Sequence, residues 1–238
     1  FVSVAALVAP AELPAHVEAL KSQQHRWTKG SIQTARKLLP AIFRSAQPPR
    51  VKIEALLHLT NNAAYPLLLL SGLLLLPVME LTSSTAPMFA LALDVGLILA
   101  GIVPVCVFLA AGQWANGVRG WRVLRDVAAV LVLGAGLSAN NARAVLQGLG
   151  RRVGDWERTP KTGDGDGAAF LVPYAPRRSR SGWFELLLAL YFACLAGLAW
   201  HEGQEGSMPF LLLLCVGLTY VGMLSVRPQR AAVHGGTG

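Results

Sequence analysis

The sequence predicts an all-α fold: a polytopic membrane helix bundle with four transmembrane helices and interfacial amphipathic helices beside them. Hydrophobic residues make up 53% of the chain and charged residues only 14%, and the mean hydropathy is +0.47. This composition indicates that lipid is part of the solvent. The net charge is +8, and the basic residues are confined to stretches outside the apolar runs. This distribution is typical of loops that face an anionic leaflet, and it argues against nucleic-acid binding.

Four apolar runs are long enough to cross a hydrocarbon core of about 30 Å as helices. They are residues 63–81, 87–112, 183–201 and 207–226. A fifth run, 127–139, would cover only about 20 Å at about 1.5 Å per residue. We interpret it as part of an interfacial helix, with a fifth span as the alternative, because the next apolar residues form one stripe: Ala142, Val145, Leu146 and Leu149.

The placement of lysine and arginine favours four spans over five. Residues 1–62 carry 8 of these side chains, 113–182 carry 11 and 227–238 carry 2, which accounts for all 21. Positive charge near helix ends marks the cytoplasmic side. Four spans place every basic residue there, whereas a fifth span would move 8 of the 21 across the membrane. We therefore expect a multi-pass protein of the plasma (inner) membrane with both ends cytoplasmic.

A helical pattern over residues 14–40 opens at Pro14, is interrupted at Gly30 and closes at Pro40. Within it, Gln23, Arg26 and Trp27 are spaced i, i+3 and i+4, so they share one helix face. An amide, a guanidinium and an indole presented together can hydrogen-bond a sugar, pair with a diphosphate and stack on a pyranose ring. The alternative is an interfacial helix that Trp27 and Arg26 anchor at the lipid headgroups.

The segment Gln23-Gln24-His25-Arg26-Trp27 matches the Q-x-x-R-W motif of processive family 2 glycosyltransferases. The longer run SQQHRWTKGSIQTARKLLP resembles bacterial cellulose-synthase-like and mannan-synthase-like members. The resemblance implies that this helix lies on the cytoplasmic side, between a catalytic domain and a transmembrane channel. It also implies that Trp27 stacks on the acceptor end of a growing glycan, with Gln23 and Arg26 lining the same site.

A second segment, Trp156-Glu157-Arg158-Thr159-Pro160-Lys161, resembles the gating-loop motif F-x-V-T-x-K of the same family and its R-T-P-K variant. Here Trp replaces Phe and Arg replaces Val. The resemblance implies that Arg158, Thr159 and Lys161 close over the nucleotide-sugar. The R-T-P-K tetrapeptide alone could equally be a solvated stretch of loop with two cations. Its position before the last two apolar runs is what favours the gating-loop interpretation.

The resemblance divides the chain into five parts. They are the end of a catalytic domain with interfacial helices (1–62), a transmembrane pair (63–112), an interfacial helix with a gating-type loop (113–182), a second transmembrane pair (183–226) and a disordered tail (227–238). Because the sequence opens at Phe1 without an initiator Met, we expect it to be the C-terminal part of a longer protein.

The implied parent enzyme is an inverting hexosyltransferase that elongates a β-linked polysaccharide from UDP-glucose or GDP-mannose and translocates the growing β-glycan. Its catalytic base and the residues that hold Mg²⁺ or Mn²⁺ are expected upstream. The acidic residues before the first span, Glu12, Glu18 and Glu54, are isolated in the sequence, so we expect this segment alone to be inactive and to contain no metal site.

Two other functions remain compatible with the sequence. One is a family 2 enzyme that glycosylates a lipid or carrier without translocating a polymer, against which the R-T-P-K segment argues. The other is a transporter or channel subunit, for which four spans and Asp94 would suffice. Asp94 lies well inside the second span, where a carboxylate either faces a polysaccharide channel or pairs inside the bundle.

The charge bias predicts the sidedness of three positions. Single cysteines introduced at Ser83 and Ser207 should react with a membrane-impermeant thiol reagent from the outside, and a cysteine at Thr162 should react only from the inside. Labelling of position 162 from outside would contradict the four-span topology.

Overall fold

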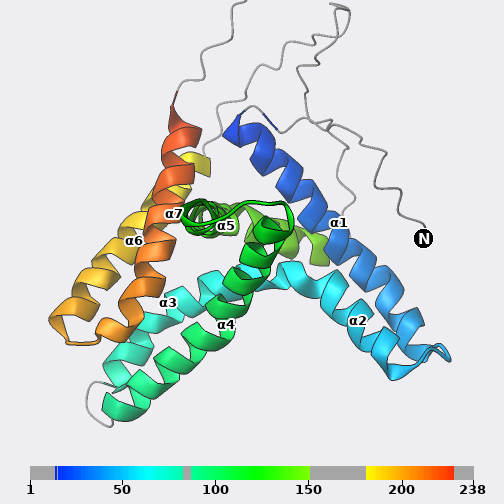
Figure 1. Ribbon diagram of the computed structural model, residues 1–238, viewed down its shortest axis with the longest axis horizontal. Helices are drawn as coiled ribbons and strands as arrows, with labels where there is room; N and C mark the ends of the chain where they lie inside the picture. The colour runs from blue at the N-terminus through cyan, green and yellow to red at the C-terminus, as the bar shows by residue number, and fades with distance from the viewer. Residues whose placement is uncertain (1–13, 15, 83–86, 151–180, 228–238) are drawn as a thin grey trace, which may run out of the picture.

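The computed structural model describes residues 14, 16–82, 87–150 and 181–227. Within these residues every regular element is a helix (Figure 1), which confirms the predicted all-α class. The α-helices are α1 (Val17–Arg44), α2 (Pro49–Thr60), α3 (Ala64–Thr82), α4 (Pro87–Ala115), α5 (Trp121–Leu149), α6 (Ser181–His201) and α7 (Met208–Val226). Two short 3₁₀ turns, η1 (Asn61–Ala63) and η3 (Glu205–Ser207), precede α3 and α7.

Four helical stretches in the described residues are long and apolar enough to cross a membrane. They are Pro49–Glu80, Trp121–Leu149, Gly182–His201 and Glu205–Val226, so the chain has the character of a multi-pass membrane protein. Two of them contain the predicted spans 183–201 and 207–226, and Pro49–Glu80 contains the predicted span 63–81 except for its last residue. The predicted span 87–112 lies within the 29-residue helix α4, of which the segment Gly101–Ala115 is described as a shorter apolar helix.

Helix α5 contains the apolar run 127–139 and continues to Leu149, the last residue of the predicted apolar stripe. It begins at Trp121, six residues before that run, and so reaches 29 residues. Its length would allow it to cross a membrane, but its direction differs from that of the last two helices. In Figure 1, α5 is seen end-on while α6 and α7 run in the plane of the picture.

Helix α1 also differs from the prediction. The expected interruption at Gly30 and end at Pro40 were both wrong, because α1 continues through both residues to Arg44. A glycine inside a helix costs only about 1 kcal/mol relative to alanine. Pro40 lies near the C-terminal end of the helix, where it removes one intrahelical hydrogen bond. The helix ends at Ser45, whose amide and hydroxyl both donate to the carbonyl of Ile42.

The core lies where α3 and α5 meet the hairpin of α6 and α7. Its fully buried side chains include Phe192 of α6 and three leucines of α7, Leu211, Leu214 and Leu218. Helix α3 approaches Phe192 at Gly72, where an added Cβ would lie 2.7 Å from the phenyl ring. The same hairpin is tied to α3 by polar contacts, since Gln204 Nε2 donates to the carbonyl of Met79 at 3.1 Å.

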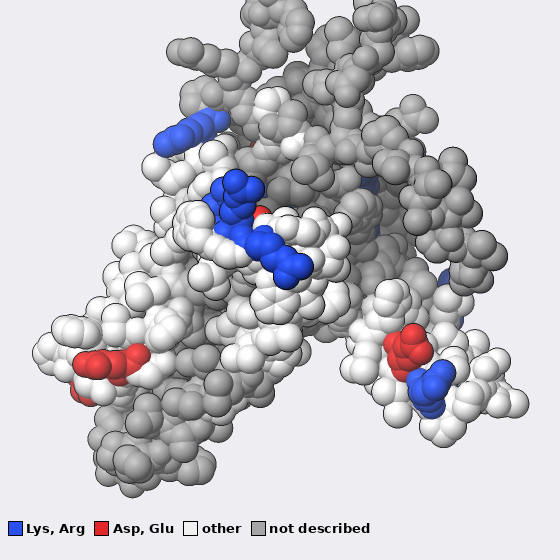
Figure 2. Space-filling view, viewed as in Figure 1, with Lys and Arg blue, Asp and Glu red and all other residues white. Residues whose placement is uncertain are grey.

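The hairpin turns at Gly203, whose φ of +68° only glycine adopts without strain. The amide of Gln204 donates to the carbonyl of Ala199 at 2.8 Å, the long-range bond of a Schellman C-cap. Figure 2 shows acidic side chains gathered at this turn and basic ones over the hairpin of α4 and α5. The corresponding residues are Glu202 and Glu205 in the turn and Arg119, Arg122 and Arg125 in the other hairpin. Charge is therefore separated along the molecule in the pattern that the topology prediction uses.

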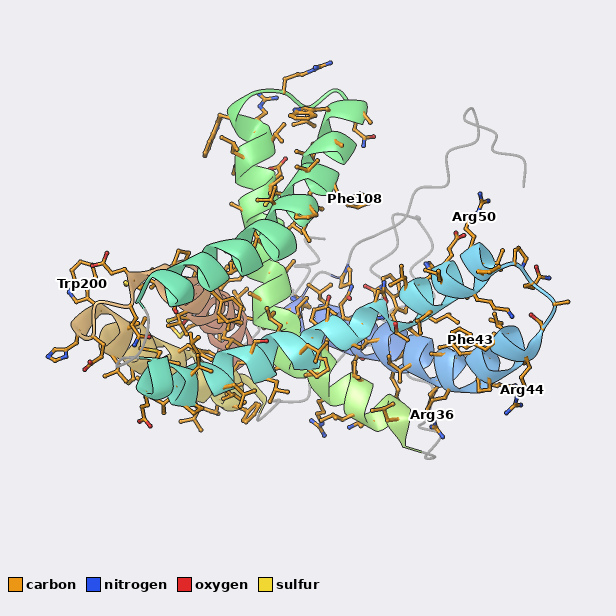
Figure 3. All side chains as sticks on the ribbon, turned by 90° about the horizontal axis from the view of Figure 1, so that it is seen from below. Arg36, Phe43, Arg44, Arg50, Phe108 and Trp200 are labelled. Carbon is orange, nitrogen blue, oxygen red and sulfur yellow. The ribbon has the colours of Figure 1, made fainter. Side chains whose placement is uncertain are left out.

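The C-terminal part of α4 and the N-terminal part of α5 form a hairpin that projects from the bundle. Figure 3 shows α4 bending part-way along its length, with the labelled Phe108 beyond the bend. Pro104 lies inside this helix, and a proline in a helix interior removes a hydrogen bond and crowds the preceding turn. The bend therefore has a local cause in the sequence.

Helices α5 and α7 cross with their backbones in contact. A Cβ added at Gly217 would lie 2.5 Å from the carbonyl oxygen of Val132 and 2.7 Å from the amide nitrogen of Gly136. Real side chains do not approach so closely, so the crossing requires glycine on both helices. Small residues at such crossings allow the close approach that drives helix association in lipid.

We expect Gly136→Val to destabilise the protein by about 1 to 3 kcal/mol, the usual cost of forcing extra atoms into a filled contact. Gly134→Val is the matched control, because a side chain at Gly134 on the same helix would meet no described atom within 4 Å. The measurement is the apparent Tm of the purified protein in detergent. Equal melting temperatures for the two variants would contradict the close crossing.

Candidate functional site

Helix α1 packs through two of its faces. One face meets α5 and buries Lys21, Thr28 and Ile32, which recur at helical spacing. The second meets the start of the α2–α3 unit, because Ser31 Oγ donates to the carbonyl of Leu59 at 3.0 Å and Thr28 Oγ1 to Asn62 Oδ1 at 3.4 Å. These contacts hold α1 on two sides, and a third face of the helix points away from both α5 and the α2–α3 unit.

The predicted binding residues lie on that third face. Gln23 and Arg26 are half-buried, whereas the indole of Trp27 is 61% exposed. Gly30 follows Trp27 by one turn on the same side, and a Cβ there would meet no described atom within 4 Å. The open space at Gly30 leaves room for a planar ring to approach the indole. The structure thus keeps the three side chains on one helix, with the largest of them accessible.

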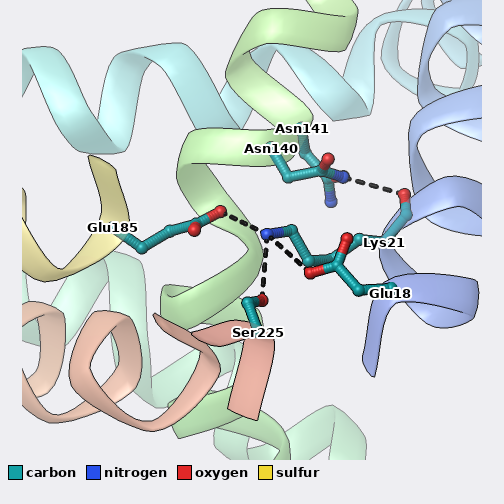
Figure 4. Close-up of polar contacts among 6 residues, drawn as sticks. All are labelled: Glu18, Lys21, Asn140, Asn141, Glu185 and Ser225. Atoms are coloured by element: carbon teal, nitrogen blue, oxygen red, sulfur yellow. Dashed lines mark hydrogen bonds and ion pairs between the residues drawn. The ribbon is translucent and has the colours of Figure 1, made fainter. Parts of the chain in front are cut away.

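A buried polar cluster lies next to this face where four helices converge (Figure 4). We call it the polar junction, and its members are Glu18, Lys21, Asn140, Asn141, Glu185 and Ser225. Lys21 Nζ lies 2.7 Å from Glu185 Oε1 and 3.5 Å from Glu18 Oε1, and it donates to Ser225 Oγ at 3.1 Å. The side chains of Lys21 and Glu185 are 4% and 2% exposed. One ammonium therefore joins α1 to both helices of the C-terminal hairpin.

Sequence reasoning missed this junction. Glu18 stands apart from other acidic residues in the sequence, but it forms an ion pair with Lys21, which lies one turn further along the same helix. Lys21 and Glu185 were not singled out at all. The available signal was Glu185, the one acidic residue in the apolar run 183–201. A carboxylate in such a run is costly unless it is paired, so it predicts a buried cation nearby.

Two asparagines of α5 complete the junction. Asn140 Nδ2 donates to the carbonyl of Lys21 and to Asn141 Oδ1, both at 3.0 Å. Asn140 therefore makes a hydrogen bond between α5 and α1 as well as one within α5. Asn141 Nδ2 and Glu185 Oε2 are buried without a hydrogen-bond partner among the described residues. A water molecule or a further polar group can satisfy this remaining capacity.

A second contact fixes α1 to the end of α5. Arg36, labelled in Figure 3, donates to the carbonyl of Gly148 at 3.2 Å and also to that of Gly150. These carbonyls have no intrahelical partner, and a cation at a helix C-terminus is favourable. His25 Nε2 and Gln147 Oε1 are 2.9 Å apart on the same interface. At Gly148 an added Cβ would lie 2.9 Å from Ile32 Cβ, so the two helices are close there.

These two contacts place both ends of the connection 151–180 on α1. Arg36 holds the end of α5, which precedes the connection, and Lys21 holds the beginning of α6, which follows it. Lys21 and Arg36 are separated by about 22 Å along the helix at about 1.5 Å per residue, and the Gln23 to Trp27 segment lies between them. The predicted loop residues Arg158, Thr159 and Lys161 themselves fall outside the described residues.

Asp94 lies in α4, but its side chain is outside the described part of the structure. Within the described residues no three His, Cys, Asp or Glu side chains are grouped as a metal site would require. Comparisons with models of protein families, with curated proteins and with solved structures find no match to this chain. The site must therefore be interpreted from its own chemistry.

Replacing Arg36 by Gln should loosen the end of α5, because the cap contributes charge-assisted hydrogen bonds of about 1.5 to 3 kcal/mol. Amide hydrogen exchange over residues 146–149 should become about tenfold faster or more, at about 1.4 kcal/mol per factor of ten. Lys37→Gln removes the same charge from the neighbouring exposed residue and should leave exchange unchanged. Similar exchange in both variants would mean that Arg36 does not hold this helix end.

Proposed function

We propose that this chain is the membrane-embedded part of a processive, inverting family 2 glycosyltransferase, which elongates a β-linked polysaccharide and translocates it across the membrane. The observation that carries the proposal is the Q-x-x-R-W segment on α1, where Gln23, Arg26 and Trp27 share one helix face and the indole of Trp27 is 61% exposed. An anchoring role at the headgroups would use the indole of Trp27 and the guanidinium of Arg26. It would not need the Gln23 amide at the same helix face.

In this proposal each of the three side chains has a separate task. The indole of Trp27 stacks on the terminal sugar of the acceptor, because a pyranose ring presents an apolar face to an aromatic ring. The Gln23 amide can both donate to and accept from sugar hydroxyls. The Arg26 guanidinium offers the planar pair of donors that a diphosphate accepts in bidentate fashion. Together they bind and orient substrates and leave proton transfer to groups elsewhere.

The connection 151–180 supports the same proposal. Its described neighbours on both sides are attached to α1, on either side of the Gln23 to Trp27 segment. We propose that Thr159 and Lys161 contact the nucleotide and that Arg158 belongs to the same loop motif, as the family resemblance implies.

The proposed donor is UDP-glucose or GDP-mannose, with Mg²⁺ or Mn²⁺ to neutralise its diphosphate. The described residues of this chain do not supply a ligand set for that metal. Metal binding and the catalytic base are therefore assigned to the parent enzyme and not to this segment.

The proposal predicts that Trp27→Ala lowers polymer synthesis by the full-length protein about tenfold or more, at about 1.4 kcal/mol per decade. Loss of an aromatic stacking partner removes on the order of 1 to 3 kcal/mol, with base stacking as the nearest analogue. Because Trp27 is exposed, the melting temperature should stay at the wild-type value. Trp27→Phe, which keeps a ring, should retain most of the synthesis. The measurement is incorporation of labelled sugar into polymer by purified protein in proteoliposomes.

Trp121→Ala is the matched control. Its indole is 70% exposed at the start of α5, so this variant loses an accessible tryptophan that is not part of the motif. Synthesis should remain close to wild type. If Trp27→Ala and Trp121→Ala give equal synthesis, the motif tryptophan is a membrane anchor and the proposal loses its main support.

A further inference from the structure

The face of α1 that carries Trp27 is positioned by a contact that does not touch it. Lys21 precedes Trp27 by six residues, about 9 Å along the helix, and points into the bundle instead of toward the open face. Its partners lie at one end of the C-terminal hairpin: Glu185 near the start of α6 and Ser225 near the end of α7. The polar junction therefore ties the motif helix to both helices of that hairpin at once.

The other polar contacts of α1 join it to α5 and to the start of the α2–α3 unit, and not to the hairpin; they come from Arg36, His25, Ser31 and Thr28. The buried apolar side chains of α1 are small or aliphatic: Ala19, Ile32 and Ala35. Apolar burial is non-directional, so a slide of α1 by part of a turn exchanges one such contact for another. Lys21 Nζ lies 2.7 Å from Glu185 Oε1 and also donates to Ser225 Oγ. The energy of such charge-assisted hydrogen bonds depends steeply on distance and angle. The junction sets the register of α1 against the hairpin.

We propose that Lys21 and Glu185 are positioning residues, whose ion pair holds the Gln23 to Trp27 face in one register relative to the α6–α7 hairpin. This inference rests on the proposed function, since it assigns the register a role in keeping the acceptor glycan aligned for successive additions. When the register is lost, the acceptor is released or misaligned between additions. The product becomes shorter, because the acceptor is held less well between successive additions.

A double substitution separates this role from simple stabilisation. Lys21→Met alone leaves Glu185 buried without a cation and should reduce the amount of folded protein. Lys21→Met combined with Glu185→Met replaces the pair with apolar side chains, a change that is often neutral for stability. It also removes the directional contact. Lys21→Glu combined with Glu185→Lys preserves the two carboxylates and one ammonium of the junction in a new arrangement.

The first measurement is product length, together with kcat and the KM for the nucleotide-sugar, per folded enzyme in proteoliposomes. For the Met pair we expect mean product length to fall about fivefold or more, the factor that corresponds to one hydrogen bond of ordinary strength. The charge-exchanged pair should restore most of the length. A Met pair that folds and makes polymer of wild-type length would overturn the inference.

The second measurement does not depend on activity. Spin labels at Thr34→Cys on α1 and Leu212→Cys on α7, with Cys106, Cys194 and Cys215 replaced by alanine, report the register directly. The distance distribution from pulsed electron resonance should be narrow in the parent and in the charge-exchanged pair, and broad in the Met pair. Both labelled positions are exposed.

The two measurements distinguish a failure of the proposed function from a failure of the positioning contact. A wild-type protein that makes no polymer, but whose distance distribution broadens in the Met pair, would overturn the proposed function and leave the positioning contact supported. Unchanged distributions in all variants would overturn the positioning contact whatever the activity. If the Met pair does not fold, the charge-exchanged pair decides: wild-type folding with a narrow distribution supports the positioning contact, and wild-type folding with a broadened distribution contradicts it.

Discussion

A carboxylate buried near the start of an apolar helix constrains the rest of this molecule. Glu185 has a side chain only 2% exposed, and such a group is strongly destabilising without a cation and hydrogen-bond donors. Lys21 supplies the cation from a helix far away in the sequence, and Ser225 and the asparagines of α5 occupy the space around it. The helix that carries the Q-x-x-R-W segment therefore cannot be placed independently of the C-terminal hairpin.

The bundle is joined by a few short contacts and not by long seams between parallel helices. Glycines at 136 and 217 let α5 pass directly over α7, which directs the far end of α5 toward α1. Arg36 then fixes that end through the carbonyls of Gly148 and Gly150. Each contact limits one degree of freedom: the crossing sets the direction of α5, the cap sets where it meets α1, and the ion pair sets where α1 meets the hairpin.

The parts of this arrangement that depend on local pattern could be predicted from the sequence. Apolar runs of sufficient length identified α3, α6 and α7, and the i, i+3, i+4 spacing placed Gln23, Arg26 and Trp27 on one face. The length of α5 could not be predicted in this way, because hydropathy marks apolar segments and a helix also continues through polar residues such as Asn140. The Lys21 pair could not be predicted because its partner is distant in sequence. Only the isolated charge of Glu185 indicated that a partner was needed.

The distance in sequence between the two partners of the ion pair has a consequence for biosynthesis. Lys21 is made before Glu185, and chains fold as they emerge from the ribosome. Until α6 is inserted, the lysine of α1 has no buried carboxylate from that helix to meet. The motif helix can therefore reach its final place only after α6 has been translated, so that chains truncated before α6 keep the recognition residues but lack the junction that locates them.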